Sequence, residues 1–286
     1  MKNTLLLVDG HNLLFRMFYG MPDRYRTASG GRYNAVCGFG NVMAAVVSAL
    51  SPTHALVLFD TEDCGDRRSL DEAYKANRPD YSGMEPDDVP FTQLPAVCAL
   101  LDSCGIPRWF ARGCEADDLI ASYALGAGED TDVVILSSDR DYWQLIGERI
   151  RTALWQAGTL TLTDPAAVRA KFGVDPEQFC DWKCLVGDSS DNIAGVPGVG
   201  PKTAAALLSR FGTVEGIYLN IDEIEKPKLR SALLASRERM DLNRRLIRLE
   251  ASVPPPVPYE ALAFTPSFPR SVYALAKTCA ERQANG

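Results

Sequence analysis

The sequence predicts an α/β protein in which a central, mostly parallel sheet is flanked by helices. Three apolar segments, TLLLVD (4–9), HALVLFD (54–60) and DVVILSSD (132–139), are separated by stretches with helical spacing. Apolar strands that do not alternate with polar residues are typical of a parallel sheet covered by helices on both faces. Each segment ends in an aspartate, and the ligands of such sheets lie beyond the carboxyl ends of the strands.

The remaining elements of this α/β half follow in chain order. Helical spacing runs through 39–50 and 91–104, a short strand is expected near 106–110, and a helix begins at EADDLIASYAL. The segments IRTALWQ and TLTLT, joined by Ala157 and Gly158, predict a hairpin at one edge of the sheet.

A polar stretch of about thirty residues follows the second strand. It combines Arg67, Arg68, Lys75 and Arg78 with a tail rich in proline, glycine and aspartate. So long a segment of weak periodicity inside a compact domain indicates a functional flap or a disordered loop. Helix-forming residues mixed with basic ones at 66–76 favour a flap that touches substrate.

From about residue 171 the chain changes to short helices. DPEQFCDWKCLVG predicts a helix with Asp175 as its N-cap and Pro176 in its first turn. The glycine-rich turn GVPGVG leads to a second helix that opens at Pro201. We expect an α/β core over 1–170 with the flap at about 62–92, a helical region over 171–250, and a tail over 251–286 that begins as an extended connector.

Composition limits the class of protein. The 286 residues, 46% of them hydrophobic, can bury a core, and no run of about 18 apolar residues predicts a transmembrane helix. The N-terminus lacks a secretory signal. The eight cysteines include no CxxC pair, so we expect free thiols in a reducing cytoplasm. Nothing suggests an oligomer, and we expect a cytoplasmic monomer without membrane contact.

The net charge of −7 is unevenly distributed. Residues 1–199 carry 17 Lys and Arg against 28 Asp and Glu, whereas residues 200–250 carry 10 against 7. Bound metal would offset part of the acidic excess, so the total is compatible with DNA binding through local basic surfaces without demonstrating it.

Nine acidic residues lie at separated places along the chain. They are Asp9, Asp60, Glu115, Asp117, Asp118, Asp139, Asp141, Asp188 and Asp191. Acids brought together at the ends of parallel strands repel one another unless something neutralises them. A pair of divalent cations held by carboxylates would do so, and that arrangement cleaves phosphodiesters. The sequence therefore predicts a metal-dependent nuclease.

Two of the acidic motifs have alternative interpretations. If these acids lie within a regular helix, Glu115 and Asp118 share a face. If they lie at the N-terminus of a helix, Glu115 and Asp117 can both reach one site. Gly113, just before the motif, supports a helix start here. Acids there also complement the helix dipole without any metal. Their combination with the acids at three strand ends favours a metal site.

The SSDRD motif places Asp139 and Asp141 two residues apart at a strand end, where both would face one metal. A DxD motif is also typical of aspartyl-phosphate phosphatases, where it ends the first strand. Here that strand ends Asp9-Gly10-His11, which disfavours a phosphatase. We interpret His11 as a hydrogen-bonding loop residue rather than a ligand.

The segment GVPGVGPKTA combines glycines with the start of a helix. Backbone N–H groups freed there form an anion site suited to a phosphate of the DNA backbone. Its spacing differs from GxxxxGK[ST], so ATP is not expected. The residues concerned are Gly195, Val196, Gly198, Val199, Gly200, Lys202 and Thr203.

In this order, LLVDGHNLLFR, LFD, RxxxxxxYKANRP, GCEADDLIAS, SSDRDYWQL and GDSSDNIAGVPGVGPKTA resemble the motifs of the 5′-nuclease family. That family includes flap endonucleases and the 5′-nuclease domain of bacterial DNA polymerase I. The resemblance, over roughly 4–220, implies a SAM-like helix–hairpin–helix variant with two flanking helices (H3TH) in the helical region. It also implies a helical arch or clamp, formed by 62–92, over the active site. No polymerase domain follows in the sequence, so we expect a stand-alone nuclease.

The resemblance also implies roles for single residues. The first metal would be held by Asp9, Asp60, Glu115 and Asp117, with Asp117 bridging. The second would be held by Asp139, Asp141 and Asp191, while Asp118 and Asp188 would act through bound waters. The scissile phosphate or the 5′ strand would be engaged by Lys75, Arg67 and Arg78. The implied ions are two Mg²⁺ or Mn²⁺, with K⁺ at the H3TH hairpin.

The implied reaction is hydrolysis of DNA near a 5′ end, at a 5′ flap, a 5′ overhang or a duplex end, in replication and repair. Two alternatives stay open. A PIN-like ribonuclease is disfavoured by the hairpin segment, which adds a grip on duplex DNA, and a non-catalytic DNA-binding protein is disfavoured because no acid is missing. The stretch PDYSGMEPDDVP after Arg78 is unusually acidic for a flap that threads a strand, which leaves the form of the arch open.

Overall fold

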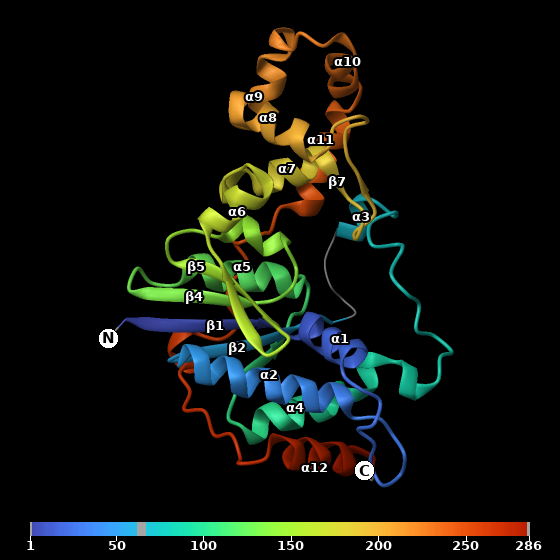
Figure 1. The fold of residues 1–286 in the computed structure, drawn as a ribbon, viewed down its shortest axis with the longest axis vertical. Coiled ribbons are helices and arrows are strands. Elements are labelled where there is room, and N and C mark those ends of the chain that lie inside the picture. Colours follow the sequence, from blue (N-terminus) through green and yellow to red (C-terminus); the bar gives the residue numbers. More distant parts are fainter. Residues whose placement is uncertain (1, 62–66, 285–286) are drawn as a thin grey trace.

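The computed structural model describes residues 2–61 and 67–284. Its centre is a six-stranded sheet in the order β3-β2-β1-β4-β5-β6 (Figure 1). The strands are β1 (Asn3–Asp9), β2 (His54–Phe59), β3 (Arg108–Phe110), β4 (Thr131–Leu136), β5 (Ile150–Gln156) and β6 (Thr159–Thr163). The first five are parallel and β6 is antiparallel to β5, which confirms the parallel sheet and the edge hairpin expected from the sequence.

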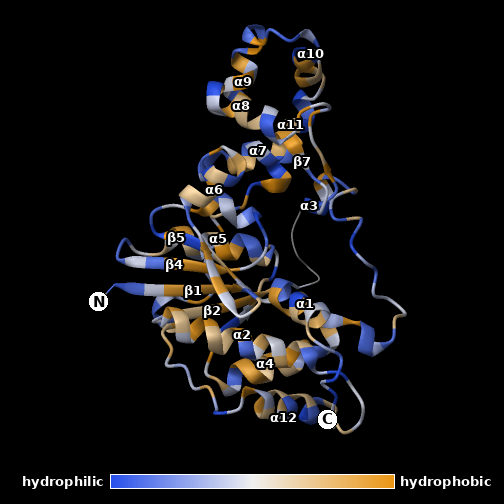
Figure 2. Cartoon of the chain, viewed as in Figure 1, coloured by the Kyte–Doolittle hydropathy of each residue, from blue (hydrophilic) through white to orange (hydrophobic). Residues whose placement is uncertain are grey.

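Helices cover both faces of the sheet because its strands are apolar on both sides, as Figure 2 shows. Leu6 and Val8 of β1 face one core, and Leu5 and Leu7 face the other. The first core is completed by α1 (Gly10–Gly20), α2 (Asn34–Leu50), α4 (Leu94–Ser103) and α12 (Val272–Ala284). The second is completed by α5 (Ala116–Gly126) and η6 (Tyr259–Leu262).

The strand register brings acidic residues to one edge of the sheet. Asp9, the last residue of β1, lies beside Leu58 of β2, and Asp60 follows directly after that strand. The neighbouring strand β4 ends at Leu136, one register position before Asp9, and Asp139 follows three residues later. All three aspartates therefore lie at the carboxyl edge of the parallel strands.

The helical region has a hydrophobic core of its own, which includes Leu185, Leu208 and Ile217. Its elements are α6 (Pro165–Phe172), η4 (Pro176–Gln178), α7 (Phe179–Val186), α8 (Pro201–Phe211), α9 (Val214–Leu219), η5 (Ile221–Glu223), α10 (Pro227–Ala235) and α11 (Arg237–Ile247). Between α7 and α8 the short strands β7 (Gly187–Asp188) and β8 (Ile193–Ala194) pair antiparallel. Figure 1 places this region beyond the edge of the sheet near β5 and α5.

The arch segment, residues 62–92, is mostly irregular. Residues 62–66 lie outside the described part of the chain, and the rest contains only the one-turn helix α3 (Arg67–Leu70), turns, and the 3₁₀ helices η1 (Pro86–Asp88) and η2 (Pro90–Gln93). This differs from the helical arch that the resemblance implied, because prolines and a glycine interrupt the segment after α3. The chain instead runs extended from the helical region toward α1 (Figure 1).

Two acids in the tail of the arch pair with arginines of the loop that follows α1. Arg26 lies 2.7 Å from Asp87, and Arg32 lies 3.9 Å from Asp88. Asp80 accepts hydrogen bonds from Ser82 of its own turn. These acids of the stretch after Arg78, whose charge is unusual for a flap that threads a strand, thus have partners close by.

Within residues 2–61 and 67–284, no helix is long and apolar enough to cross a membrane. Seven cysteines of the described part carry free thiols, as expected, and Cys64 lies outside it.

Candidate metal-binding site

Asp9 and Asp60 are held by the N-termini of two helices. Oδ1 of Asp9 accepts a hydrogen bond from the N–H of Asn12 at 3.0 Å, which caps α1. Oδ1 of Asp60 accepts one from the N–H of Ala116 at 2.7 Å, at the start of α5. Because an aspartate at a helix N-terminus satisfies an otherwise unpaired donor, the same bonds that start the helices fix these carboxylates at the edge of the sheet.

Asp117, in the first turn of α5, is linked to Asp9 through a tyrosine. The hydroxyl of Tyr142, in the 3₁₀ helix η3 (Asp141–Leu145), donates to Oδ1 of Asp117 and lies 3.4 Å from Oδ2 of Asp9. The hydroxyl of Ser137 donates to the same Asp9 oxygen at 3.0 Å. Tyr142 is fully buried, so these contacts are sheltered from water.

Asp9, Asp60, Asp117 and Asp139 form what we call the inner cluster. Burial raises the pKa of Asp9 to about 6, and the charges of Asp60 and Asp139 act in the same direction. Burial, with the charges of the other three, raises the pKa of Asp117 well above its usual value. For Asp60, burial is outweighed by His11 and a backbone N–H, which lower its pKa. The inner cluster thus carries more negative charge than its surroundings neutralise.

Asp141, Asp188 and Asp191 form the outer cluster, which joins the core to the helical region. One carboxylate oxygen of each lies within 4.8 Å of the others. Nζ of Lys183, on α7, contacts Asp141 and lies 2.5 Å from Asp188. Although burial acts in the opposite direction, Lys183 lowers the pKa of Asp188. A buried ammonium group therefore stands beside carboxylates that could hold a cation.

Asp139 acts through its charge on Asp9 and Asp117, whereas Asp141 groups with Asp188 and Asp191. That Asp139 and Asp141 both face one metal stays a prediction. β4 ends at Leu136, so the geometry that aligns every second residue of a strand no longer applies at these positions. The chain turns there, and the N–H of Asp141 donates to Oδ1 of Asp139 at 2.9 Å.

Glu115, the N-cap residue of α5, faces the basic residues of the arch. Its Oε2 lies 2.9 Å from Nζ of Lys75 and 3.2 Å from Nη1 of Arg67. Burial alone would lower the pKa of Lys75, but Tyr74, Glu115 and Asp117 raise it. The ammonium group of Lys75 therefore stays charged between Glu115 and the inner cluster.

The base of the arch is bound to the loop between β7 and β8. The N–H of Lys75 donates to the carbonyl of Asp191 at 3.0 Å, and Asn192 donates to the carbonyl of Ala73 at 2.8 Å. Lys75 and Asn192 have φ of +56° and +59°, in the left-handed region that non-glycine residues rarely adopt. Arg78 lies 3.3 Å from the Asp191 carboxylate, so it too reaches the outer cluster.

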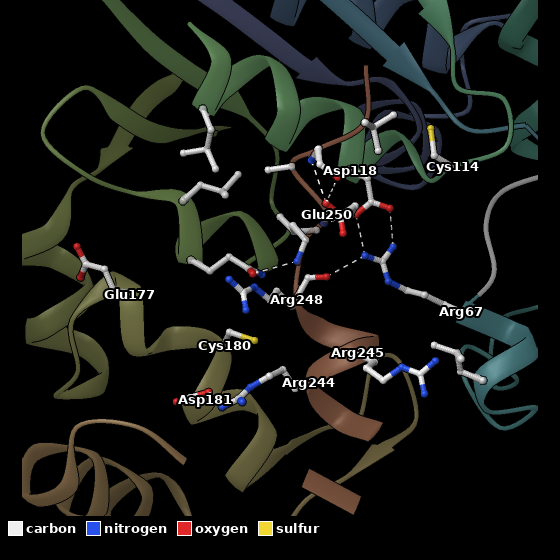
Figure 3. A pocket seen from close by; sticks show the side chains of 18 of the residues that line it. Arg67, Cys114, Asp118, Glu177, Cys180, Asp181, Arg244, Arg245, Arg248 and Glu250 are labelled. Atoms are coloured by element: carbon white, nitrogen blue, oxygen red, sulfur yellow. Dashed lines mark hydrogen bonds and ion pairs between the residues drawn. The ribbon is translucent and has the colours of Figure 1, made fainter. Parts of the chain in front are cut away.

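Asp118 is hydrogen-bonded to Arg67. Its two oxygens accept hydrogen bonds from Arg67 at 2.7 and 2.9 Å, and one of them also accepts from the N–H of Glu250 at 2.8 Å (Figure 3). The pair lines a pocket of about 1250 Å³ that also includes Arg244 and Arg248. Asp118 therefore engages Arg67 within the protein, and the water-mediated metal contact expected for Asp118 stays a prediction.

The residues of the predicted hairpin differ in what they can offer a ligand. Val196 and Val199 are buried, and their N–H groups donate to carbonyls of the helical region. Gly195 approaches Val186 so closely that an added Cβ would lie 2.3 Å from its carbonyl carbon. These residues shape the hairpin, and the groups left near its surface belong to Gly198, Gly200, Lys202 and Thr203.

Tyr142 and Lys183 are not among the site residues expected from the sequence. A lysine inside the otherwise apolar segment WKCLV was a usable signal, because a lysine on a buried helix requires a partner. A tyrosine in a short helix has the pattern of an ordinary core residue and gives no such signal. His11 behaves as expected, since its Nδ1 accepts from the N–H of Asp60 at 3.1 Å, although it lies in α1 rather than in a loop.

Both clusters fit divalent cations by their donor chemistry. Their donors are carboxylate oxygens, which Mg²⁺ and Mn²⁺ prefer. The raised pKa values of Asp9 and Asp117 reflect negative charge that a bound cation would compensate.

Known sequences match the chain along nearly its whole length. The family model described as 5′-3′ exonuclease, N-terminal resolvase-like domain, matches residues 4–173, and the model described as 5′-3′ exonuclease, C-terminal SAM fold, matches residues 174–269. The chain belongs to the 5′-3′ exonuclease family.

Relatives of this family member include both short and long proteins. A 5′-3′ exonuclease of Streptomyces coelicolor is 35% identical over 285 residues, which cover 95% of this chain and 94% of that protein. DNA polymerase I of Bacillus caldotenax is 35% identical over 280 residues, 97% of this chain and 31% of the polymerase. DNA polymerase I of Thermus thermophilus is 37% identical over 254 residues, which cover 88% of this chain and 29% of the polymerase. This family member thus spans about a third of the length of the polymerases.

Solved structures share the fold of this 5′-3′ exonuclease family member. The bacteriophage T5 D15 protein co-crystallised with metal ions has a TM-score of 0.71 at 23% identity, with 99% of each chain covered. The catalytic core of Rad2 in complex with a DNA substrate has a TM-score of 0.61 at 15% identity, covering 100% of this chain and 89% of that one. At these identities the likeness establishes the α/β core with its C-terminal SAM-fold region.

Proposed function

We propose that this protein is a divalent-metal-dependent, structure-specific 5′-nuclease that acts on DNA as a 5′-3′ exonuclease and flap endonuclease. The observation that carries the proposal is the meeting of the inner and outer clusters beside the charged Lys75. The S. coelicolor relative is named a 5′-3′ exonuclease. A T5 D15 structure with a TM-score of 0.68 is described as a flap endonuclease with DNA and metal ions. Both descriptions support the proposal.

The inner cluster with Glu115 would hold one Mg²⁺ or Mn²⁺ ion, and the outer cluster a second. Bound ions of this kind activate a water molecule and stabilise the leaving oxygen of a phosphodiester. The ammonium of Lys75, fixed by Glu115 at 2.9 Å, would stabilise the negative charge that builds up on the phosphate in the transition state. Arg78, whose side chain is half exposed, would contact the 5′ strand.

The substrate would be DNA with a 5′ flap, a 5′ overhang or a duplex end, met during replication and repair in the cytoplasm. The surface groups of Gly198, Gly200, Lys202 and Thr203 would hold the duplex through its phosphates, independently of sequence. A K⁺ ion at carbonyls of the same hairpin remains a prediction of the family resemblance, and a monomeric state remains the expectation because nothing in the sequence suggests an oligomer. Comparing DNA affinity in KCl and NaCl tests the first, and light scattering tests the second.

The deciding experiment compares cleavage of a 5′-labelled flap duplex and of a matched single-stranded RNA, in Mg²⁺, by the wild type and Asp139→Asn. Asp130→Asn, which removes an exposed carboxylate before β4, is the matched control. Flap cleavage that is lost in Asp139→Asn and kept in Asp130→Asn supports the two-metal DNA nuclease.

Either alternative function would give a different pattern. Cleavage of RNA alone would favour a PIN-like ribonuclease. Tight binding of the flap duplex without cleavage by the wild type would favour a non-catalytic DNA-binding protein.

A further inference from the structure

Arg140 and Lys171 approach the same two aromatic rings. The guanidinium carbon of Arg140 lies 5.9 Å from the centre of the Trp143 ring and 6.0 Å from that of Phe172. Nζ of Lys171 lies 5.2 and 5.8 Å from these ring centres. Both cations are exposed, and neither forms an ion pair with an acid in the described part of the chain.

Arg140 has two acidic neighbours in the sequence and forms an ion pair with neither of them. It stands between Asp139 and Asp141 in the sequence, yet its guanidinium is held over the rings instead of pairing with either carboxylate. Cation–π contacts at exposed sites contribute only about 0.5–1 kcal/mol, and two cations on one pair of rings repel each other. An anion between them would remove that repulsion.

Arg140 lines a pocket of about 470 Å³ between the α/β core and the helical region, and Lys171 lies near the ring of Phe172, which also lines it. The pocket is also lined by Asp139 of the inner cluster, by Asp188 of the outer cluster, and by Lys183, which contacts the outer cluster. Trp143 belongs to η3 of the core and Phe172 to α6 at the start of the helical region. Arg140 therefore stands where a chain running from the acidic clusters to the helical region would pass, and Lys171 lies over the same two rings.

We propose that Arg140 and Lys171 form a binding site for a backbone phosphate of DNA, which we call the junction site. The inference rests on the proposed function and adds a contact to it. A guanidinium fork beside an ammonium group suits the oxygens of a phosphodiester. Because a phosphate carries no sequence information, the junction site holds DNA of any sequence in register between the acidic clusters and the hairpin.

The test measures equilibrium binding of a fluorescent 5′-flap duplex, with divalent ions chelated, over a series of salt concentrations. We expect Arg140→Gln/Lys171→Gln to bind about tenfold more weakly at low salt and to lower the slope of log K against log salt by about one. The control is Arg270→Gln/Arg282→Gln, which removes two exposed charges at and near α12, at the opposite end of the molecule from the helical region (Figure 1). It should keep the wild-type affinity and slope.

The outcomes separate the inference from the proposed function. If the double variant keeps the wild-type slope, or weakens binding no more than the control does, while the wild type binds and cuts the flap, the junction site is wrong and the proposed function stands. A wild type that neither binds nor cuts DNA overturns both. Should the double variant fail to fold, Lys171→Gln alone, at an exposed position in the last turn of α6, serves the same purpose.

Discussion

Tyr142 donates the hydrogen of its buried hydroxyl to the carboxylate of Asp117. Burial, with the charges of Asp117 and Asp9, raises the pKa of Tyr142 well above its usual value, so the hydroxyl keeps its proton and acts as a donor. One oxygen of Asp117 is thereby tied to the protein, which directs the orientation of the other.

Replacing Tyr142 by Phe should therefore disturb the inner cluster without leaving a large cavity. Loss of a buried hydrogen bond to a charged group should lower the free energy of unfolding by about 1–3 kcal/mol. Loss of a group that orients a metal ligand should weaken Mn²⁺ binding by about 10-fold or more. Denaturant unfolding and calorimetric titration measure the two effects.

Tyr123→Phe is the matched control, since its hydroxyl donates to the Val257 carbonyl at 2.8 Å, away from the acidic clusters. It should lose stability but not metal affinity. Equal Mn²⁺ affinity in Tyr142→Phe and the wild type would show that the tyrosine is only a core residue.

Replacing Lys183 by Met should have the opposite effect on the outer cluster. The substitution removes a buried ammonium from Asp141 and Asp188, so the carboxylates should bind Mn²⁺ more tightly. We expect an increase in affinity of about tenfold, which corresponds to about 1.4 kcal/mol of binding free energy. The metal-free variant should also be less stable, because two partly buried carboxylates lose their partner. Weaker Mn²⁺ binding would mean that Lys183 instead holds these carboxylates in the geometry that a metal needs. Lys277→Met, on the exposed surface of α12, is the control.

Stability of the metal-free protein should depend on pH through Asp9. Its pKa is raised from 3.8 to about 6 in the folded state, so between these values the folded protein binds more protons than the unfolded one. The free energy of unfolding should then rise as pH falls from 7 to 5. Asp9→Asn should weaken this dependence, leaving the part that comes from the raised pKa of Asp117, and should be more stable than the wild type at pH 7 by on the order of 2–3 kcal/mol.

Chemical denaturation in a chelator at pH 5, 6, 7 and 8 checks this expectation. Asp60→Asn provides a contrast of opposite sign, because the pKa of Asp60 is lowered by its partners and its loss should destabilise the protein at pH 7. A wild type whose stability falls from pH 7 to 5 in step with Asp9→Asn would contradict the assignment.

Substitutions of Arg67 and Arg78 should affect different properties, the first mainly the stability of the protein and the second mainly its cleavage activity. Arg67 bonds Asp118 through both oxygens and is largely buried, so Arg67→Met should lower the free energy of unfolding by about 3 kcal/mol or more. Arg78 is half exposed, and Arg78→Met should cost under about 1 kcal/mol while slowing flap cleavage. Thermal unfolding and cleavage rates of the two variants test this, and a stable Arg67→Met would contradict it.

The fold and the inner cluster follow from local patterns in the sequence. Apolar runs ending in aspartate predict β1, β2 and β4 with their acids at one edge, because neighbouring residues alone decide both features. The direction of Asp118 could not be predicted in this way, since its partners Arg67 and Glu250 lie 51 and 132 positions away. The relative orientation of Asp139 and Asp141 depends on where β4 ends, and strand ends are weakly encoded.

The site draws on two parts of the chain that each have their own hydrophobic core. Asp188 and Asp191 come from the helical region, and the other acids come from the α/β core. Correct folding of each part is therefore necessary for the site but not sufficient. A molecule whose two halves fold and then associate at a slightly different angle would keep its secondary structure and its solubility, yet have incomplete chemistry. Activity consequently reports on the final docking step of folding, which circular dichroism does not detect.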